Sequence, residues 1–201
     1  MKRELFEKFI NENLKIIGEM RKYACDLHDV TCNQKYGDNL PYSYHLCMVA
    51  NAAIEYGHIV CYDEHHILPI IFGAYFHDSI EDARMTYNDV LKVAKTFMNE
   101  HQAIIATEIV YALTDEKGRN RKERASDKHY EDIRNTLYAP FVKWCDRYAN
   151  MKYSIEVGSR MVNVYSKEMM DFITKIGSDK YLSRELCEIL FDLEKQNEQP
   201  N

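Results

Sequence analysis

The chain has 201 residues, of which 46% are hydrophobic and 29% charged, a balance that suits one soluble domain with a core of its own. Its formal net charge of −6 argues against a broad surface for a nucleic acid polymer. The longest apolar stretch, 67–76, is about half a membrane span, and the N-terminus lacks the apolar centre of a signal peptide. None of the six cysteines belongs to a Cys-x-x-Cys pair. We therefore expect a cytoplasmic protein that has reduced thiols and contacts no membrane.

Helical periodicity dominates the chain, and glycine and proline are scarce, at 7 and 4 residues. Apolar residues recur at steps of three or four between residues 5 and 20, which predicts a first helix. The segment 33–41 is polar and turn-rich and predicts a loop, whereas Thr86 followed by Asp89 is typical of a helix start. Further helices are predicted near 43–57, 65–80, 86–99, 101–113, 121–138, 139–152, 159–176 and 181–195.

These elements predict an all-α, single-domain helical bundle over residues 1–193. Its chemistry-bearing motifs lie within about 30–155, and its C-terminal helices lie over 159–195. The polar segment 194–201 is predicted to be a disordered tail. The sequence leaves open whether the chain forms a homo-oligomer.

The most informative segment runs from Ala74 to Asp82. An apolar run leads into His77 and Asp78, and two more acids, Glu81 and Asp82, follow within a turn. Buried charges are costly unless they are paired or coordinate a metal. If the segment is helical, His77 and Glu81 project from one side, and so do Asp78 and Asp82. Mixed nitrogen and oxygen ligands suit manganese, iron, zinc or nickel better than calcium, so the segment predicts part of a transition-metal site.

Two further polar residues, His45 and Asp146, each end or interrupt an apolar stretch elsewhere in the chain. A fold that brought them to the 77–78 pair would give a His-His-Asp-Asp shell with open positions for water and substrate. A divalent ion in such a shell can clamp phosphoryl oxygens and activate water. The sequence therefore predicts metal-assisted hydrolysis.

Each of these residues also has a purely structural interpretation. His45 by itself would more often be a histidine whose hydrogen bonds are satisfied within the core. Asp146 could pair with a neighbouring basic residue, and Glu81 and Asp82 could be a solvated pair. The arrangement of all of them in one chain favours the functional interpretation.

Two other clusters are predicted not to be sites. His28-Asp29 has no acid following at the matching position, and we interpret it as an exposed helix end. The members of the cluster 63–66 are consecutive, so they would point in different directions on a helix. Asp63 is better explained as a helix N-cap.

The order of a histidine, a His-Asp pair and a distant aspartate resembles the HD superfamily of metal-dependent phosphohydrolases. The finer motifs resemble the hydrolase domain of RelA/SpoT-type alarmone enzymes, over roughly residues 30–155. The motifs are Pro41-Tyr42-x-x-His45, His77-Asp78-x-x-Glu81-Asp82, Leu113-Thr114-Asp115 and Asp146-Arg147-x-x-Asn150-Met151-Lys152. The resemblance implies an HD-type helical bundle that removes the 3′-pyrophosphate from guanosine tetra- or pentaphosphate.

The resemblance also assigns roles to individual residues. Glu81 and Asp82 would position and activate the attacking water, and Asn150 would contact the nucleotide. One divalent ion, usually manganese in this family, would be held by four residues. These ligands would be His45, His77, Asp78 and Asp146.

The segment before His45 differs from the family pattern, which carries several basic residues there. Here it holds a single lysine, Lys35, and the aromatic Tyr36. We expect both to bind substrate, with Tyr36 the best candidate for stacking on the base. The basic run from Lys117 to Arg124 is either a solvated face or a lid that meets substrate phosphates.

Two alternative functions stay open at this point. The altered segment before the first histidine is compatible with an HD-type phosphohydrolase for another nucleotide, a 5′-monophosphate or a deoxynucleoside triphosphate. A nucleotide-binding regulator without turnover is the other alternative. A complete metal shell with two additional acids argues against it, because a pure binder has no need of water-activating groups.

Overall fold

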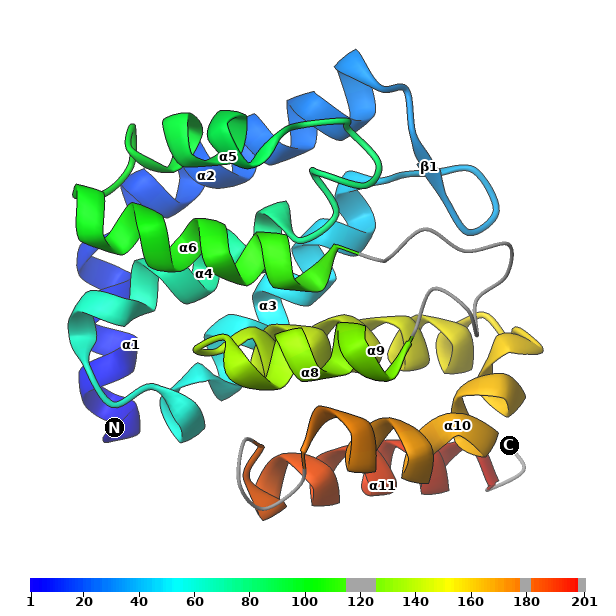
Figure 1. Cartoon of the computed structure of the whole chain (residues 1–201). Helices are drawn as coiled ribbons and strands as arrows, with labels where there is room; N and C mark the ends of the chain where they lie inside the picture. The colour runs from blue at the N-terminus through cyan, green and yellow to red at the C-terminus, as the bar shows by residue number, and fades with distance from the viewer. Residues whose placement is uncertain (115–125, 178–181, 199–201) are drawn as a thin grey trace.

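The computed structural model describes residues 1–114, 126–177 and 182–198, with the backbone alone for 196–198 (Figure 1). The only strands in these ranges are β1 (Lys35–Tyr36) and β2 (Leu40–Pro41), a short antiparallel pair. The remaining elements are α1 (Arg3–Glu12), α2 (Leu14–Cys25), the π-helix η1 (Asp26–Thr31), α3 (Ser43–Val60), the 3₁₀-helix η2 (Glu64–His66), α4 (Ile67–Phe76), α5 (Tyr87–Ala94), α6 (Glu100–Leu113), α8 (Asp127–Asn135), α9 (Ala139–Glu156), α10 (Met161–Ile176) and α11 (Arg184–Glu198). The predicted all-α fold is therefore confirmed, with a minimal hairpin inside the segment predicted to be a loop.

Helix α4 lies at the centre of the bundle and is buried along its whole length. It is apolar on all sides, as expected for a helix without a solvent face. It packs against α2, α3, α6 and α9. Gly73 permits the close approach of α6, because a Cβ at this position would lie 2.7 Å from the Cγ2 atom of Ile109. The central helix thus delivers its C-terminal end, and the polar segment that follows, to a fixed place between α3 and α9.

Capping boxes define the starts of α5 and α6. The hydroxyl of Thr86 accepts from the backbone N–H of Asp89 at 3.2 Å, and the Asp89 carboxylate accepts from the Thr86 N–H at 2.9 Å. Asn99 and Gln102 repeat the arrangement at α6. Such reciprocal bonds satisfy backbone donors that the first helical turn leaves unpaired. The helix start predicted at Thr86 is therefore confirmed.

The helix predicted over 65–80 ends earlier than expected, at Phe76. Residues 77–82 form consecutive turns, in which the N–H of Asp82 donates to the carbonyl of Asp78 at 2.8 Å. The N–H of Ser79 donates to the carbonyl of Phe76 at 2.9 Å, a tighter bond than the helical spacing. Arg84 then adopts a positive φ of 57°, which directs the chain away toward α5. The site acids therefore lie on a turn structure at the end of α4 and not on the helix itself.

The C-terminal part packs beneath the rest of the bundle, with α10 and α11 below α8 and α9 (Figure 1). Trp144 of α9 is fully buried, and its indole N–H donates to the carbonyl of Leu186 in α11 at 2.9 Å. Helix α11 continues to Glu198, within the segment for which the sequence predicts a disordered tail from residue 194. Leu190 and Leu193 are buried on the same helix and hold its last turns against the bundle. Residues 199–201 lie outside the described residues.

Within the described ranges, every helix is too short or too polar to span a bilayer.

Candidate metal centre and its cavity

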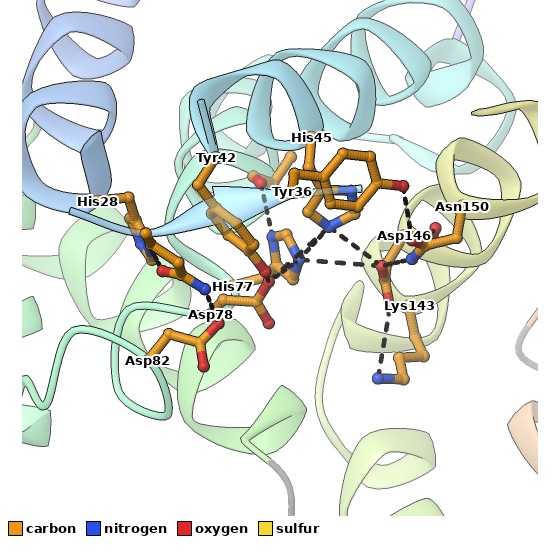
Figure 2. A network of polar contacts seen from close by, with 12 residues as sticks. His28, Tyr36, Tyr42, His45, His77, Asp78, Asp82, Lys143, Asp146 and Asn150 are labelled. Atoms are coloured by element: carbon orange, nitrogen blue, oxygen red, sulfur yellow. Dashed lines mark hydrogen bonds and ion pairs between the residues drawn. The ribbon is translucent and has the colours of Figure 1, made fainter. Parts of the chain in front are cut away.

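Two histidines and an aspartate from distant parts of the chain meet at one point (Figure 2). His45 comes from the first turn of α3, His77 follows the end of α4, and Asp146 lies in the middle of α9. The Nε2 atom of His45 lies 3.3 Å from Nε2 of His77 and 3.4 Å from Oδ1 of Asp146. The ligand atoms of the three residues all lie within 4.8 Å of one another. The convergence predicted from the sequence is therefore present in the fold.

Asp78 lies beside this group and has a hydrogen bond of its own. Its Oδ2 atom is 2.8 Å from Nε2 of His77 and 3.8 Å from Nε2 of His45. The same oxygen accepts a hydrogen bond of 2.5 Å from the hydroxyl of Tyr42, which precedes α3. The four residues expected as ligands are thus adjacent, with Asp78 supported from outside by a tyrosine.

The orientation of the two imidazoles suits a metal site. Nδ1 of His77 lies 3.0 Å from the carbonyl of Ala74 and donates to it, so Nε2 is the atom that faces Asp78 and His45 and can bind a proton or a metal ion. Two ligand atoms about 2.1 Å from one ion, at tetrahedral or octahedral angles, are about 3.0 to 3.4 Å apart. The separation of 3.3 Å between the imidazole nitrogens falls within that range. Nδ1 of His45 is buried without a hydrogen-bond partner among the described residues.

Electrostatics keep both aspartates ionised. Burial raises the pKa of the Asp78 carboxyl, but His77 and His45 outweigh burial and hold this pKa well below its usual range. Burial acts in the same way on Asp146, and His45 and Lys143 reverse its effect, so the pKa of Asp146 is also strongly lowered. For His77, burial lowers the pKa, yet the carboxylates raise it to about 9. A group of two carboxylates and a cationic imidazole is one in which a divalent cation can replace the proton.

Glu81 and Asp82 lie next to this group and line the same cavity, which has a volume of about 770 Å³. Oδ2 of Asp82 accepts a hydrogen bond of 2.7 Å from the side-chain amide of Gln34. His45, Asp78 and Asp146 also line the cavity. Three of the four predicted ligands and both predicted water-handling acids therefore line one cavity of a size typical of small-molecule sites, whereas His77 is not among its lining residues.

The residues expected to bind substrate are placed differently from one another. Tyr36 and Asn150 line the cavity, but both also contact the metal group. The Tyr36 ring stacks on the His45 ring with 4.8 Å between ring centroids, and the Tyr36 hydroxyl donates to Oδ1 of Asn150 at 2.9 Å. The Asn150 amide in turn donates to Oδ1 of Asp146 at 2.5 Å. Both side chains therefore support His45 and Asp146. Lys35 is exposed and is not among the described residues that line the cavity, so its contact with substrate stays a prediction.

Sequence reasoning missed the opposite wall of the cavity, which α10 and its neighbours build. Lys175 of α10 lines the cavity, 3.1 Å from Oδ2 of Asp171 and 5.6 Å from the ring centroid of Tyr130. Lys143 of α9 lines it as well, 3.6 Å from Oδ2 of Asp146. The position of Lys143 one turn before Asp146 was a usable signal, whereas α10 carries no motif. The basic run Lys117–Arg124 lies outside the described residues.

Arg147 belongs to the same wall, although it follows Asp146 in the chain. Its guanidinium lies 3.1 Å from Oε2 of Glu168 and 4.4 Å from the ring centroid of Phe172. Arginine commonly combines an ion pair with stacking on an aromatic ring in this way. The arginine of the predicted Asp-Arg motif therefore joins α9 to α10 and does not contact the metal group.

The prediction that His28 lies at an exposed helix end is wrong, because its side chain is fully buried. The helix η1 contains a wider turn, in which the N–H of Cys32 donates to the carbonyl of Leu27, five residues earlier, at 3.0 Å. Side chains on such a turn do not follow α-helical spacing, and His28 lies buried on it. The prediction for Asp63 is confirmed, since its carboxylate caps η2 by accepting from the N–H of His65 at 2.9 Å.

Comparison with known proteins identifies the fold. No family model and no curated protein matches the sequence. A solved structure described as "A metazoan ortholog of SpoT hydrolyzes ppGpp and plays a role in starvation responses" superposes with a TM-score of 0.60. The match covers 90% of this chain and 95% of that chain at 19% identity. The chain has the fold of a SpoT-type hydrolase. The HD-type bundle expected from the motifs is therefore confirmed at the level of fold.

Proposed function

We propose that the chain is a metal-dependent phosphohydrolase that removes the 3′-pyrophosphate from guanosine tetra- or pentaphosphate. The observation that carries the proposal is the meeting of His45, His77 and Asp146 within 4.8 Å, next to a cavity that Glu81 and Asp82 line. The fold shared with a protein described as hydrolysing ppGpp supports the choice of substrate.

The residues fit a divalent transition metal, which His45, His77 and Asp146 would hold with Asp78 beside them. When bound, the ion would supply Lewis-acid stabilisation of charge on the phosphoryl oxygens. We propose manganese, with iron, zinc or nickel as alternatives, because imidazole and carboxylate donors suit all of them.

Glu81 and Asp82 are proposed to handle the attacking water. One carboxylate accepts a proton from the water as the water oxygen forms a bond to the phosphorus attached to the ribose 3′-oxygen. The bond between that phosphorus and the 3′-oxygen breaks, and the leaving oxygen takes up a proton. The products are guanosine diphosphate and pyrophosphate for the tetraphosphate. A carboxylate that lines the cavity suits this work, since proton transfer by a positioned side chain contributes about 10²- to 10⁴-fold.

The remaining part of the nucleotide is proposed to lie along the wall formed by α8, α9 and α10. Lys143 and Lys175 line this part of the cavity together with Arg147, whose guanidinium pairs with Glu168, and Tyr130 and Phe172 are aromatic neighbours. Lysine can bind phosphate as a point charge, and aromatic rings provide surface for a base. Each lysine now faces an aspartate at 3.1 to 3.6 Å, so substrate phosphate would exchange with a carboxylate for the same ammonium group.

Incubation of the purified protein with manganese and guanosine tetraphosphate tests the proposal. We expect guanosine diphosphate and pyrophosphate to accumulate in equal amounts, and neither to form with chelator. A panel of other nucleotides in the same assay addresses the alternatives. Phosphate released from a 5′-monophosphate, or triphosphate released from a deoxynucleoside triphosphate, would replace the proposed substrate. Tight nucleotide binding by calorimetry without any product would indicate a regulator.

A further inference from the structure

Two hydrogen bonds connect the buried His28 with the carboxylate of Asp82 at the edge of the cavity (Figure 2). Nδ1 of His28 lies 2.7 Å from Oε1 of Gln34, and Nε2 of Gln34 donates to Oδ2 of Asp82 at 2.7 Å. The histidine belongs to η1 and the glutamine lies just before β1, so a segment 48 residues from Asp82 reaches it through one side chain.

The direction of both bonds follows from the chemistry of the groups. A carboxylate can only accept, so Gln34 must direct its NH₂ group at Asp82 and its carbonyl oxygen at His28. His28 must then carry its proton on Nδ1. Its Nε2 atom is left as a buried acceptor, and this atom has no hydrogen-bond partner in the described part of the chain. Burial lowers the pKa of His28, which agrees with a neutral imidazole.

Through Tyr42, His28 also supports Asp78. Its ring stacks on the ring of Tyr42, with 5.0 Å between centroids and 19° between planes. The hydroxyl of Tyr42 donates to Oδ2 of Asp78 at 2.5 Å. One buried histidine thus contacts the two side chains, Gln34 and Tyr42, that hold Asp82 and Asp78.

We propose that His28 and Gln34 are positioning residues for hydrolysis: they hold the Asp82 carboxylate by Oδ2, which leaves Oδ1 to accept the proton of the attacking water. This inference rests on the proposed function, because it takes Asp82 to handle that water. The Gln34 amide cannot itself accept a proton from Asp82, so its contribution is geometric. A displacement of about 1 Å in a reacting group can cost about 10²-fold in rate.

Replacement of the glutamine by an apolar side chain of similar length tests the geometric role. Gln34→Met removes both hydrogen bonds, and we expect kcat to fall ~10- to 100-fold with KM and metal content unchanged. Gln102→Met is the matched control, because the Gln102 amide likewise makes two hydrogen bonds, accepting from the N–H of Asn99 and donating to the carbonyl of His65 at 2.7 Å, away from the cavity. We expect the control to lower Tm and leave kcat unchanged. The inference would be overturned if Gln34→Met left kcat unchanged, altered KM alone or lost the bound metal.

His28→Phe provides a second variant, because it keeps a ring against Tyr42 and removes the bond to Gln34. We expect kcat to fall in the same direction and by a smaller factor, since Gln34 loses its support but still reaches Asp82. If His28→Phe lost its bound metal, the change would act through the metal centre, which would contradict a role through Asp82.

A double-mutant cycle in Tm tests the connection without any substrate. Gln34→Met and Asp82→Ala are measured singly and together in the metal-free protein. We expect the combined shift in Tm to be smaller than the sum, since either change already removes the shared bond. Additive shifts would overturn the inference even if the enzyme is active. Non-additive shifts in a protein that hydrolyses no nucleotide would instead refute the proposed function and retain the hydrogen-bonded pair.

Discussion

Nε2 of His45 and Nε2 of His77 lie 3.3 Å apart although 32 residues separate them in the chain. The two nitrogens meet because α3 and α4 pack against each other and the Ala74 carbonyl fixes the ring of His77. Two imidazole nitrogens at this distance are poorly placed without a proton or a cation between them. We therefore expect a cation to bind between them.

Removal of an imidazole should remove the metal. We expect His77→Ala to be isolated with no bound manganese and to show no rise in Tm when manganese is added, because binding to the folded state alone is what raises Tm. His66→Ala is the control, since His66 bonds the hydroxyl of Tyr138 at 2.9 Å away from the site. Elemental analysis and thermal melts provide the measurement. Retained metal in His77→Ala would contradict the assignment.

Glu81→Gln should separate metal binding from water handling. We expect the variant to keep its metal and lose about 10²-fold or more of kcat, because an amide cannot accept a proton. Glu108→Gln, at an exposed position that accepts from the hydroxyl of Tyr87, should behave like the unchanged protein. Metal content and initial rates are measured on the same preparation. A metal-free Glu81→Gln protein would show that Glu81 is a ligand and not a proton acceptor.

Tyr42→Phe should weaken the metal centre without removing any ligand. The hydroxyl of Tyr42 donates to Oδ2 of Asp78, and loss of such a support typically costs about 10- to 100-fold in metal affinity. We expect a weaker manganese Kd in a competition titration with a chelating dye. Tyr62→Phe, at a residue that is 67% exposed, should leave the Kd unchanged. Equal affinities in both variants would mean that the bond to Asp78 does not tune the site.

The metal-free protein should lose stability as the pH rises from about 6.5 to about 9. The pKa of His77 increases from 6.5 to about 9 on folding because of Asp78 and Asp146, despite burial. A raised pKa stabilises the folded state below the unfolded value, and this contribution disappears as the pH passes the folded value. The effect is on the order of 3 kcal/mol. Urea unfolding with chelator at both pH values measures it, and the difference should be absent in His77→Gln.

The wall formed by α10 should affect substrate binding and not the chemical step. We expect Lys175→Met to raise KM for guanosine tetraphosphate by about tenfold with kcat unchanged, because a bond to a charged group is worth about 1.5 to 3 kcal/mol and 1.4 kcal/mol is tenfold. Lys195→Met is the control, since Lys195 pairs with Asp192 on the surface. Steady-state kinetics on both variants decide. A fall in kcat alone for Lys175→Met would place the lysine at the reacting phosphorus.

The centre of the site was predictable because its residues are rare in apolar surroundings. His45 and Asp146 interrupt apolar helical patterns, and both helices formed close to the predicted positions, so the converging side chains could be named in advance. The segment 77–82 was harder, because periodicity registers apolar spacing and does not register the tight bonds and the positive φ of Arg84 that end a helix. Asp78, Glu81 and Asp82 line one cavity, as the sequence grouping implied, although the helix expected to carry them ends at Phe76.

The supporting residues could not be predicted by the same reasoning. His28 is buried on the π-helical turn of η1, and such a wider turn has no periodic signature in a single sequence. Lys175 and Phe172 lie on an amphipathic helix, and amphipathicity does not show whether the inner face meets a core or a cavity. The burial of His28 and the exposure of Lys175 and Phe172 to the cavity depend on which elements become neighbours, and that is a property of the packed fold.

The metal centre can be located in crystals grown with manganese, with diffraction data collected near the manganese absorption edge. We expect one anomalous peak within bonding distance of Nε2 of His45, Nε2 of His77 and the carboxylate of Asp146, with Asp78 adjacent. An anomalous peak elsewhere in the protein, or none at this position under saturating manganese, would rule out the proposed metal centre.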